Sequence, residues 1–251
     1  MNKFRAAIRG LLIALLIIIH VTPALVKAVF TGIDLPLALR MRRLWARRSL
    51  KVLGVMVERQ GELPQRGPFL FVGNHRSYLD PIVVLSEIEA LPIAKAEVGS
   101  WPLIGFGAKA TGIMYVKRES KNSRAATLDA MRNTLNGGYS VLVYPEGTTH
   151  TESVTREFKK GAYSVAARGG FRVVPMAIEY GDILDAWVGN DTFIPHFVRC
   201  FGKKITCVKI AYGAPIVAED PNFLLSETRK WIDENMVRLR TEFDKGQSSV
   251  G

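Results

Sequence analysis

The stretch Phe69–Glu89, FLFVGNHRSYLDPIVVLSEIE, contains a short apolar run, a polar loop and a second apolar segment. Residues 69–73 are apolar and aromatic and end in glycine, which is typical of a buried strand. Residues 81–89 have the periodicity of a helix. Asp80-Pro81 is a favourable helix start, with Asp80 as N-cap and Pro81 at the first helical position. The stretch therefore predicts a strand, a polar loop and a helix in succession.

The same alternation continues along the chain. Further strands are expected at 91–96, 111–116, 139–144, 171–179 and 205–212, and further helices at 122–136, 158–168 and 222–244. Short strands that alternate with helices are typical of a sheet covered by helices. The sequence thus predicts an α/β fold, with a mixed, mostly parallel sheet flanked by helices. We expect this domain to occupy residues 61–251, after a separate segment at 1–60.

The positive charge of the chain is concentrated in that first segment. The net charge is +11, and residues 1–57 alone carry ten Lys or Arg and one acid, Asp34. This distribution is not that of a uniformly basic nucleic-acid binder, so we expect no nucleic-acid partner. The two cysteines, Cys200 and Cys207, fit neither a zinc pattern nor a disulfide framework, and we expect free thiols in a reducing compartment.

Residues 11–19, LLIALLIII, have no polar atom in any side chain, and the apolar character continues to about Phe30. A helix of ~20 residues is ~30 Å long, which is enough to cross the core of a bilayer. Three interpretations fit this segment: a signal peptide cut near Val26-Lys27-Ala28, a spanning helix, and a helix that lies in one leaflet.

Residues 36–52, PLALRMRRLWARRSLKV, combine five arginines and a lysine with an apolar face of Leu37, Met41, Leu44 and Trp45. A basic amphipathic helix of this kind suits an anionic membrane surface, although an ordinary packed helix with a solvated charged face has the same pattern. A secreted protein would have no evident use for such a helix beside a cleaved signal. We therefore expect a retained anchor and an interfacial helix, on the cytoplasmic face of the inner membrane.

Polar residues follow three of the predicted strands, and active sites of such sheets gather where strands end. His75 follows the first strand, and Asp80 comes five residues later. A carboxylate that holds one ring nitrogen of a histidine lets the other nitrogen take a proton from a hydroxyl. The strand at 111–116 is followed by Lys117-Arg118, two cations that can hold a phosphate or form a solvated pair near Glu119.

The strand at 139–144 leads into Tyr144–His150, YPEGTTH. Gly147 would let the backbone approach a ligand closely, and Thr148 and Thr149 add hydroxyl donors. Glu146 could accept from ligand hydroxyls or orient a cation such as Arg118. The structural alternative is an ordinary Pro-Glu-Gly turn.

Other catalytic patterns are missing from the sequence. It has no Gly-x-Ser-x-Gly elbow and no phosphate-binding Gly-x4-Gly-Lys-Ser/Thr loop. The four histidines (His20, His75, His150, His196) include no metal-spaced pair. We expect no metal site, and we expect His150 and His196 to be surface or structural residues.

The sequence resembles the glycerophospholipid acyltransferases, in particular the bacterial 1-acylglycerol-3-phosphate acyltransferases. Four blocks match that family in order: Asn74–Asp80 resembles its His-x4-Asp block, Gly112–Arg118 its Gly-x-x-aromatic-x-x-Arg block, Tyr144–Thr148 its aromatic-Pro-Glu-Gly-Thr block, and Val173–Ile178 its apolar-Pro-apolar block. The resemblance covers about residues 50–215. It implies a glycerolphosphate acyltransferase-like fold for this part of the chain.

The resemblance also implies a reaction. His75, oriented by Asp80, would deprotonate the hydroxyl of a lysolipid, and that oxygen would attack the thioester of an acyl-CoA or acyl carrier protein. No cofactor is expected, and the site should face a membrane surface. The acceptor head group would be placed by Arg118, Glu146, Gly147 and Thr148, with Lys95 and Thr149 as further candidates.

Thr149 departs from the family pattern, because phosphatidate-forming members usually have arginine directly after Glu-Gly-Thr. A charged hydrogen bond in a desolvated site is worth ~1.5–3 kcal/mol, so its loss matters for binding a phosphate. The acceptor expected first is 1-acylglycerol-3-phosphate, with Lys117 in compensation. The alternative acceptor is lyso-ornithine lipid or another lysophospholipid. A lipid hydrolase or transacylase that uses the same His-Asp pair, and a non-catalytic lipid-binding protein, are the alternatives of another class.

Overall fold

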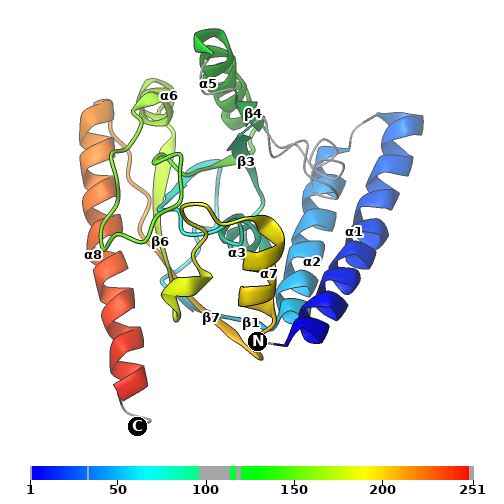
Figure 1. Ribbon diagram of the computed structural model, residues 1–251. Helices are drawn as coiled ribbons and strands as arrows, with labels where there is room; N and C mark the ends of the chain where they lie inside the picture. The colour runs from blue at the N-terminus through cyan, green and yellow to red at the C-terminus, as the bar shows by residue number, and fades with distance from the viewer. Residues whose placement is uncertain (1, 33, 96–113, 117–119, 249–251) are drawn as a thin grey trace.

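The computed structural model describes the chain except residues 1, 33, 96–113, 117–119 and 249–251. The described part forms one seven-stranded sheet with helices on both faces (Figure 1). Its strands are β1 (Val55–Gln60), β2 (Phe69–Gly73), β3 (Ala90–Lys95), β4 (Met114–Val116), β5 (Ser140–Val143), β6 (Arg172–Tyr180) and β7 (Thr206–Tyr212), in the spatial order β1-β7-β6-β2-β5-β3-β4. The predicted α/β fold is confirmed.

Strand direction determines where the loops of the sheet meet. β2 pairs in parallel with β5 and β6, and β3 pairs in parallel with β4 and β5. β1 pairs in parallel with β7, and β7 pairs antiparallel with β6. β2 to β6 therefore run in one direction, and their carboxyl ends lie along one edge of the sheet. β2 lies in the middle and all five of its residues are buried, as expected for a central parallel strand.

The helices form a layer on each face of the sheet. One face is covered by α2 (Leu35–Leu53), α3 (Asp80–Glu87) and α7 (Phe193–Phe201), and the other by α5 (Lys121–Asn136), α6 (Gly161–Gly169) and α8 (Pro221–Ser248). Successive residues of β2 point to opposite faces, so Phe69 and Phe71 pack in the first core and Leu70 and Val72 in the second. A short 3-10 turn, η2 (Ile183–Asp185), precedes α7.

Most elements lie within a few residues of their predicted bounds, and the strand at 69–73 agrees with its prediction at both ends. Residues 96 and 111–113 of two predicted strands lie outside the described residues. Neither β1 nor α7 was predicted. The sheet also begins at Val55, ahead of the predicted domain boundary at residue 61, and the division into 1–60 and 61–251 stays a prediction.

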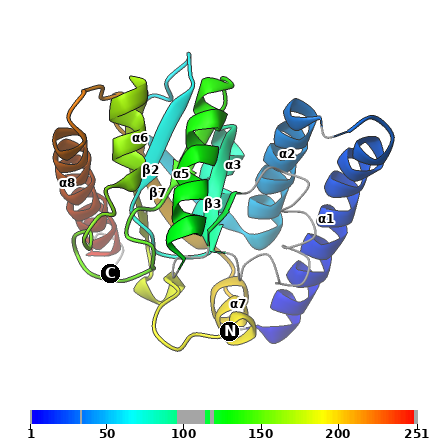
Figure 2. The same ribbon diagram turned by 90° about the horizontal axis from the view of Figure 1, so that it is seen from above.

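Helix α1 (Lys3–Thr31) is continuous through Pro23 and lies on the outside of α2 (Figures 1 and 2). Its first 21 residues, Lys3–Pro23, have a mean hydropathy of 2.1 and are long and apolar enough to cross a membrane. Arg9 joins this helix to the rest of the fold, because its guanidinium donates to the carbonyls of Phe201 (2.9 Å) and Lys203 (2.7 Å). These carbonyls lie at the end of α7, where they have no partner within the helix.

Helix α2 begins at the N-cap Asp34, whose side chain accepts from Leu37 N, and ends at Gly54 with φ +73°. Its buried face is not the predicted apolar face, whose four residues are only half-buried. The buried residues of the helix are Ala38, Leu39, Arg42, Ala46, Ser49, Leu50 and Leu53.

Several arginine side chains of α2 bind groups within the protein. Arg42 is buried and donates to Ala90 O, Arg47 Nε donates to Ser86 O at 2.7 Å, and Arg48 Nη1 lies 2.9 Å from His20 Nε2 of α1. The packed-helix alternative describes these side chains better than a free basic face does. The interfacial role of α2 remains a proposal.

Candidate active site

His75 and Asp80 are brought together by the loop that joins β2 to α3. His75 Nδ1 lies 2.8 Å from Asp80 Oδ2. The Asp80 side chain is fully buried, whereas 21% of the His75 side chain is exposed. The predicted pair is therefore within hydrogen-bonding distance, at the carboxyl end of the central strand.

Four donors hold the buried Asp80 carboxylate. Oδ2 accepts from His75 Nδ1, Arg76 N (2.6 Å) and Ser77 N (2.8 Å), and Oδ1 accepts from the hydroxyl of Tyr180 at 2.6 Å. Burial raises the pKa of the Tyr180 hydroxyl well above its ordinary value, and the Asp80 carboxylate raises it further, so the hydroxyl keeps its proton and donates. These bonds compensate the carboxylate for its lost hydration.

The expectation that Asp80 is an N-cap is wrong. Helix α3 begins at Asp80, its cap is Leu79, and no side chain makes a capping bond there. The Asp80 carboxylate instead binds the amides of residues 76 and 77 in the preceding loop.

The bond to Asp80 determines the tautomer of His75. A carboxylate accepts, so Nδ1 carries the proton and Nε2 has a free lone pair. Nothing in the described part of the chain bonds to Nε2. The imidazole also stacks on the ring of Tyr144, with centroids 4.3 Å apart and planes 12° from parallel. The imidazole is held by Asp80 and Tyr144 and is open at Nε2.

Two neighbours hold the loop that carries His75. Asn74 pairs its side-chain amide with the backbone of Ile178, donating to its carbonyl (2.9 Å) and accepting from its N–H (2.8 Å). β6 continues past the end of β2, and there the Asn74 side chain makes the hydrogen bonds to β6 that a further residue of β2 would make through its backbone. Glu146 Oε1 accepts from the amide of His75 at 2.9 Å, which joins this loop to the loop after β5.

The loop after β5 is held by contacts within the protein, and its expected contacts with an acceptor stay predictions. Glu146 is buried, and its second oxygen accepts from Arg156 N (2.8 Å) and from the ring of His150. Both oxygens thus bind the protein itself. Gly147 has φ +73° and closes a turn onto Tyr144 O at 3.0 Å, a conformation that favours glycine.

The two threonines of this loop differ. Thr148 is exposed beside the turn. Thr149 is half-buried, and its hydroxyl donates to the carbonyl of Trp187. Trp187 N in turn donates to Arg76 O at 2.8 Å, so Thr149 belongs to a chain of bonds that reaches the loop between β2 and α3.

Two expected site residues are not placed. Arg118 lies outside the described residues, and so does the side chain of Lys95, although its backbone ends β3. β4 ends at Val116 on the same edge of the sheet as the end of β2. The predicted contacts of Arg118 and Lys95 with the acceptor stay predictions.

A buried charge network beneath the site was not predicted. Arg76 donates to Glu179 Oε1 through Nε (3.0 Å) and to His150 O through Nη1 (2.8 Å). Glu179 Oε2 accepts from Arg240 of α8 at 2.6 Å. The signal was present in the sequence, because Glu179 is a charged residue at the end of the apolar run VVPMAI, where an isolated acid needs a partner.

The surface alternative for His150 and His196 is wrong, because both are buried. His196 lies 3.1 Å from the hydroxyl of Tyr78 and 3.0 Å from Ala186 O, and burial lowers its pKa. It therefore acts as a neutral link between α7 and the loop between β2 and α3. Cys200 is buried and Cys207 is exposed, and both are free thiols, as expected.

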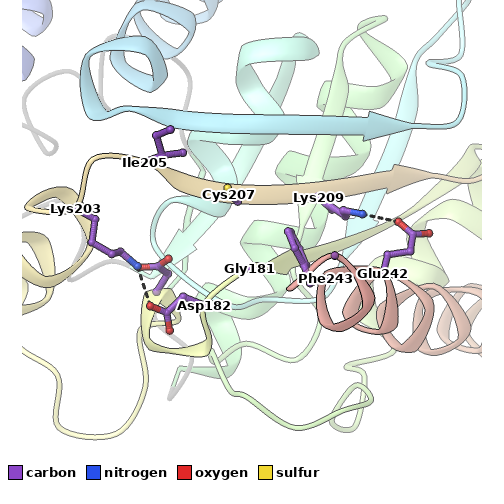
Figure 3. A pocket seen from close by; sticks show the side chains of 10 residues that line it. Gly181, Asp182, Lys203, Ile205, Cys207, Lys209, Glu242 and Phe243 are labelled. Carbon is purple, nitrogen blue, oxygen red and sulfur yellow. Dashed lines mark hydrogen bonds and ion pairs between the residues drawn. The ribbon is translucent and has the colours of Figure 1, made fainter. Parts of the chain in front are cut away.

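A cavity of about 390 Å³ lies between the end of β6, β7 and α8 (Figure 3). Its lysines are already paired: Lys203 with Asp182 (3.1 Å) and Asp185, and Lys209 with Glu242 (2.8 Å). None of the expected site residues lines it. In the described part of the chain, no group of three or more His, Cys, Asp or Glu side chains converges as metal ligands do.

Known proteins are similar to this chain in sequence. The acyltransferase family model matches residues 54–179. The lyso-ornithine lipid O-acyltransferase of Rhizobium meliloti is 26% identical over 98% of this chain and 89% of its own length. That of Pseudomonas aeruginosa is 33% identical over 73% of this chain and 72% of its own length. A chloroplastic 1-acyl-sn-glycerol-3-phosphate acyltransferase of Arabidopsis thaliana is 30% identical over 77% of this chain and 52% of its own length.

A solved structure has the same fold. The crystal structure of the 1-acyl-sn-glycerophosphate acyltransferase PlsC from Thermotoga maritima superimposes with a TM-score of 0.62 over 95% of this chain and 98% of that chain, at 22% identity. The fold described above, including the flanking helices, is therefore an arrangement already known in solved proteins.

Proposed function

The chain belongs to the acyltransferase family and is a lysolipid acyltransferase, and from this premise we propose that His75 is the general base that activates the acceptor hydroxyl. One observation carries the proposal. The buried Asp80 holds Nδ1 of His75 at 2.8 Å, while Nε2 stays open at the end of the central strand. This is the arrangement that a histidine base needs.

The proposed reaction balances without a cofactor. His75 Nε2 takes the proton of the lysolipid hydroxyl, and the oxygen bonds to the carbonyl carbon of the acyl thioester. The carbon–sulfur bond then breaks, and the imidazolium returns its proton to the leaving thiolate. Asp80 stabilises the imidazolium between the two transfers. Acyl-CoA or acyl carrier protein would serve as the donor.

The experiment that tests the function is a thiol-release assay. Purified protein in detergent would receive acyl-CoA or acyl carrier protein and a panel of lysolipids. Stoichiometric free thiol and diacyl product with at least one lysolipid are expected. Free fatty acid released without any acceptor would instead indicate the hydrolase alternative.

For the acceptor we propose lyso-ornithine lipid, with 1-acylglycerol-3-phosphate as the second candidate. The two bacterial relatives described above are named for lyso-ornithine lipid, and the chloroplastic relative for 1-acyl-sn-glycerol-3-phosphate. The threonine at position 149 favours lyso-ornithine lipid. The threonine carries no charge, and its hydroxyl is already bound to Trp187 O, so it offers nothing to a phosphate.

Replacing Thr149 by arginine tests this preference. We expect the rate with 1-acylglycerol-3-phosphate to rise relative to the rate with lyso-ornithine lipid by about 10-fold or more, because a charged bidentate donor contributes ~1.5–3 kcal/mol to holding a phosphate. Competition between the two acceptors in one assay gives the ratio directly. Thr149→Val is the control, since it removes the bond to Trp187 without adding charge. Equal ratios for all three proteins would contradict a role of position 149 in acceptor choice.

The apolar helix α1 and the lipid-modifying relatives indicate that the protein associates with a membrane. We propose that α1 provides the attachment, at the cytoplasmic face of the inner membrane. Its exposed apolar side chains are Phe4, Ile8, Leu11, Leu12, Leu15, Ile18, Ile19, Val26 and Phe30. The acyl chains of both lipids would then reach the site from the bilayer.

Leu15→Asp with Ile18→Asp should release the protein from vesicles. These side chains are 49% and 59% exposed, so the fold tolerates the change, whereas a charged residue deep in a bilayer costs ~2.5–3.5 kcal/mol. Flotation with anionic vesicles should show a partition coefficient at least about 100-fold lower. Val237→Asp on α8, where the native side chain is 47% exposed, is the matched control and should float as the wild type does. Unchanged flotation of the double variant would exclude α1 as the anchor.

A further inference from the structure

We propose that His150 is a positioning residue for His75, acting through Glu146. The inference rests on the proposed function, since it gives His150 a role in holding the proposed base. His150 and Glu146 have side chains that are 1% and 0% exposed, and both lie in the loop after β5. Neither ring nitrogen of His150 faces solvent, so each must be assigned to a partner within the protein.

The neighbours of the ring determine its tautomer. Nδ1 of His150 accepts from Glu152 N at 3.2 Å, and Arg76 Nη1 lies 3.4 Å from the same nitrogen. Both neighbours are N–H donors, so Nδ1 carries no proton. Nε2 therefore carries it and donates to Glu146 Oε2. The ring is a neutral donor aimed at one carboxylate oxygen.

These bonds close a ring around His75. Glu146 Oε1 accepts from the amide of His75 at 2.9 Å, and the amide of His150 donates to the carbonyl of His75 at 3.3 Å. The peptide groups on both sides of the His75 Cα are thus held, one by Glu146 and the other by His150. Arg76 Nη1 donates to His150 O at 2.8 Å and holds the loop that closes the ring.

These contacts determine the position of the His75 imidazole. The backbone of residue 75 determines the position of the imidazole, and the contacts with Asp80 and Tyr144 determine the orientation of its plane. Without the His150 donor, Glu146 Oε2 keeps only the bond from Arg156 N, and the carboxylate can rotate about it and release the His75 amide. A shift of about 1 Å in a reacting group can lower a rate by about 100-fold. His150 therefore contributes to the rate without contact with the substrates.

A matched pair of variants tests the bond. In His150→Gln the side-chain amide reaches the place of Nε2 and can still donate to Glu146, whereas in His150→Asn it reaches only the place of Nδ1. We expect His150→Asn to lose about 10- to 100-fold in kcat per folded enzyme, with KM for both substrates within about twofold, and His150→Gln to stay within about threefold of the wild type. Wild-type kcat in His150→Asn, or equal losses in both variants, would overturn the proposal.

A double-mutant cycle separates this role from a general effect on folding. If His150 acts through Glu146, adding His150→Asn to Glu146→Ala should lower kcat no further, and additive losses would overturn the inference. Ring ¹⁵N spectra of histidine-labelled wild-type enzyme, with His150→Gln for assignment, should show the Nε2–H tautomer for His150. A protonated Nδ1 would also overturn it, whatever the variants do.

The experiments distinguish a failure of the proposed function from a failure of the role proposed for His150. If His75→Ala keeps full activity, the general base is wrong, whereas the tautomer measurement still reports on His150. If His75→Ala is inactive and His150→Asn is fully active, only the role of His150 is lost.

Discussion

Replacing His75 by alanine is expected to lower kcat for acyl transfer by about 10³- to 10⁴-fold, the usual contribution of a histidine base held by a carboxylate. The ring is 21% exposed and its main partners are Asp80 and the stacked Tyr144, so the fold should survive its removal. Thiol release with a saturating lysolipid, measured on protein of unchanged circular dichroism, gives the result. A variant that retains more than about a tenth of the wild-type rate would exclude His75 as the base.

Asp80→Asn is the companion measurement. The amide oxygen can still accept from the amides of Arg76 and Ser77, but the side chain no longer carries the charge that stabilises the imidazolium. We expect a loss of about 10²- to 10⁴-fold in kcat. Tyr180→Phe removes only one hydrogen bond to Asp80 and should cost far less. A loss in Tyr180→Phe as large as in Asp80→Asn would mean that packing rather than charge matters at this site.

Replacing Glu179 by alanine should produce the largest loss of stability. Its carboxylate is 1% exposed and lies between Arg76, which is itself buried, and Arg240. Removing it leaves the Arg76 guanidinium without its counter-charge, and breaking a buried pair in this way costs ~3–5 kcal/mol. Chemical unfolding of the protein in detergent measures the difference.

The control for this change is an exposed pair. Glu152 binds Arg156 with side chains 54% and 46% exposed, so Glu152→Ala should change the free energy of unfolding far less than Glu179→Ala does. If Glu179→Ala changes the free energy of unfolding as little as Glu152→Ala does, the network beneath the site does not hold the fold together.

Local patterns account for the parts of the structure that the sequence predicted. β2 is recognisable because a central parallel strand is apolar throughout, and its flanking Pro68 and Gly73 mark its ends. The pairing of His75 with Asp80 follows from a short loop. β1 was missed because it is an edge strand with three polar residues at its end, Glu58-Arg59-Gln60. Pro195 obscured α7, although it lies in the first turn, where proline is tolerated.

The contacts that could not be predicted join residues far apart in sequence. Glu146 binds the amide of His75 across 71 positions, and Arg76 binds Glu179 across 103. Nothing in the Pro-Glu-Gly-Thr stretch says whether its carboxylate faces a ligand or the protein, because the choice depends on which donors the sheet brings alongside. Asp80 combines both kinds of contact, since its carboxylate binds two amides of its own loop and also the hydroxyl of Tyr180, 100 positions away on β6.

The pairing of β1 with β7 also has a consequence for biosynthesis. Val55 pairs with Thr206, and the carbonyls that bind Arg9 belong to residues 201 and 203. The N-terminal helices and β1 leave the ribosome before β7 and α7. β1 pairs with β7, and Arg9 of α1 binds the end of α7. A nascent chain that ends before β7 thus contains α1 and α2 but no completed sheet. Contacts of such long sequence separation form slowly, so the sheet finishes folding after these two helices have been made.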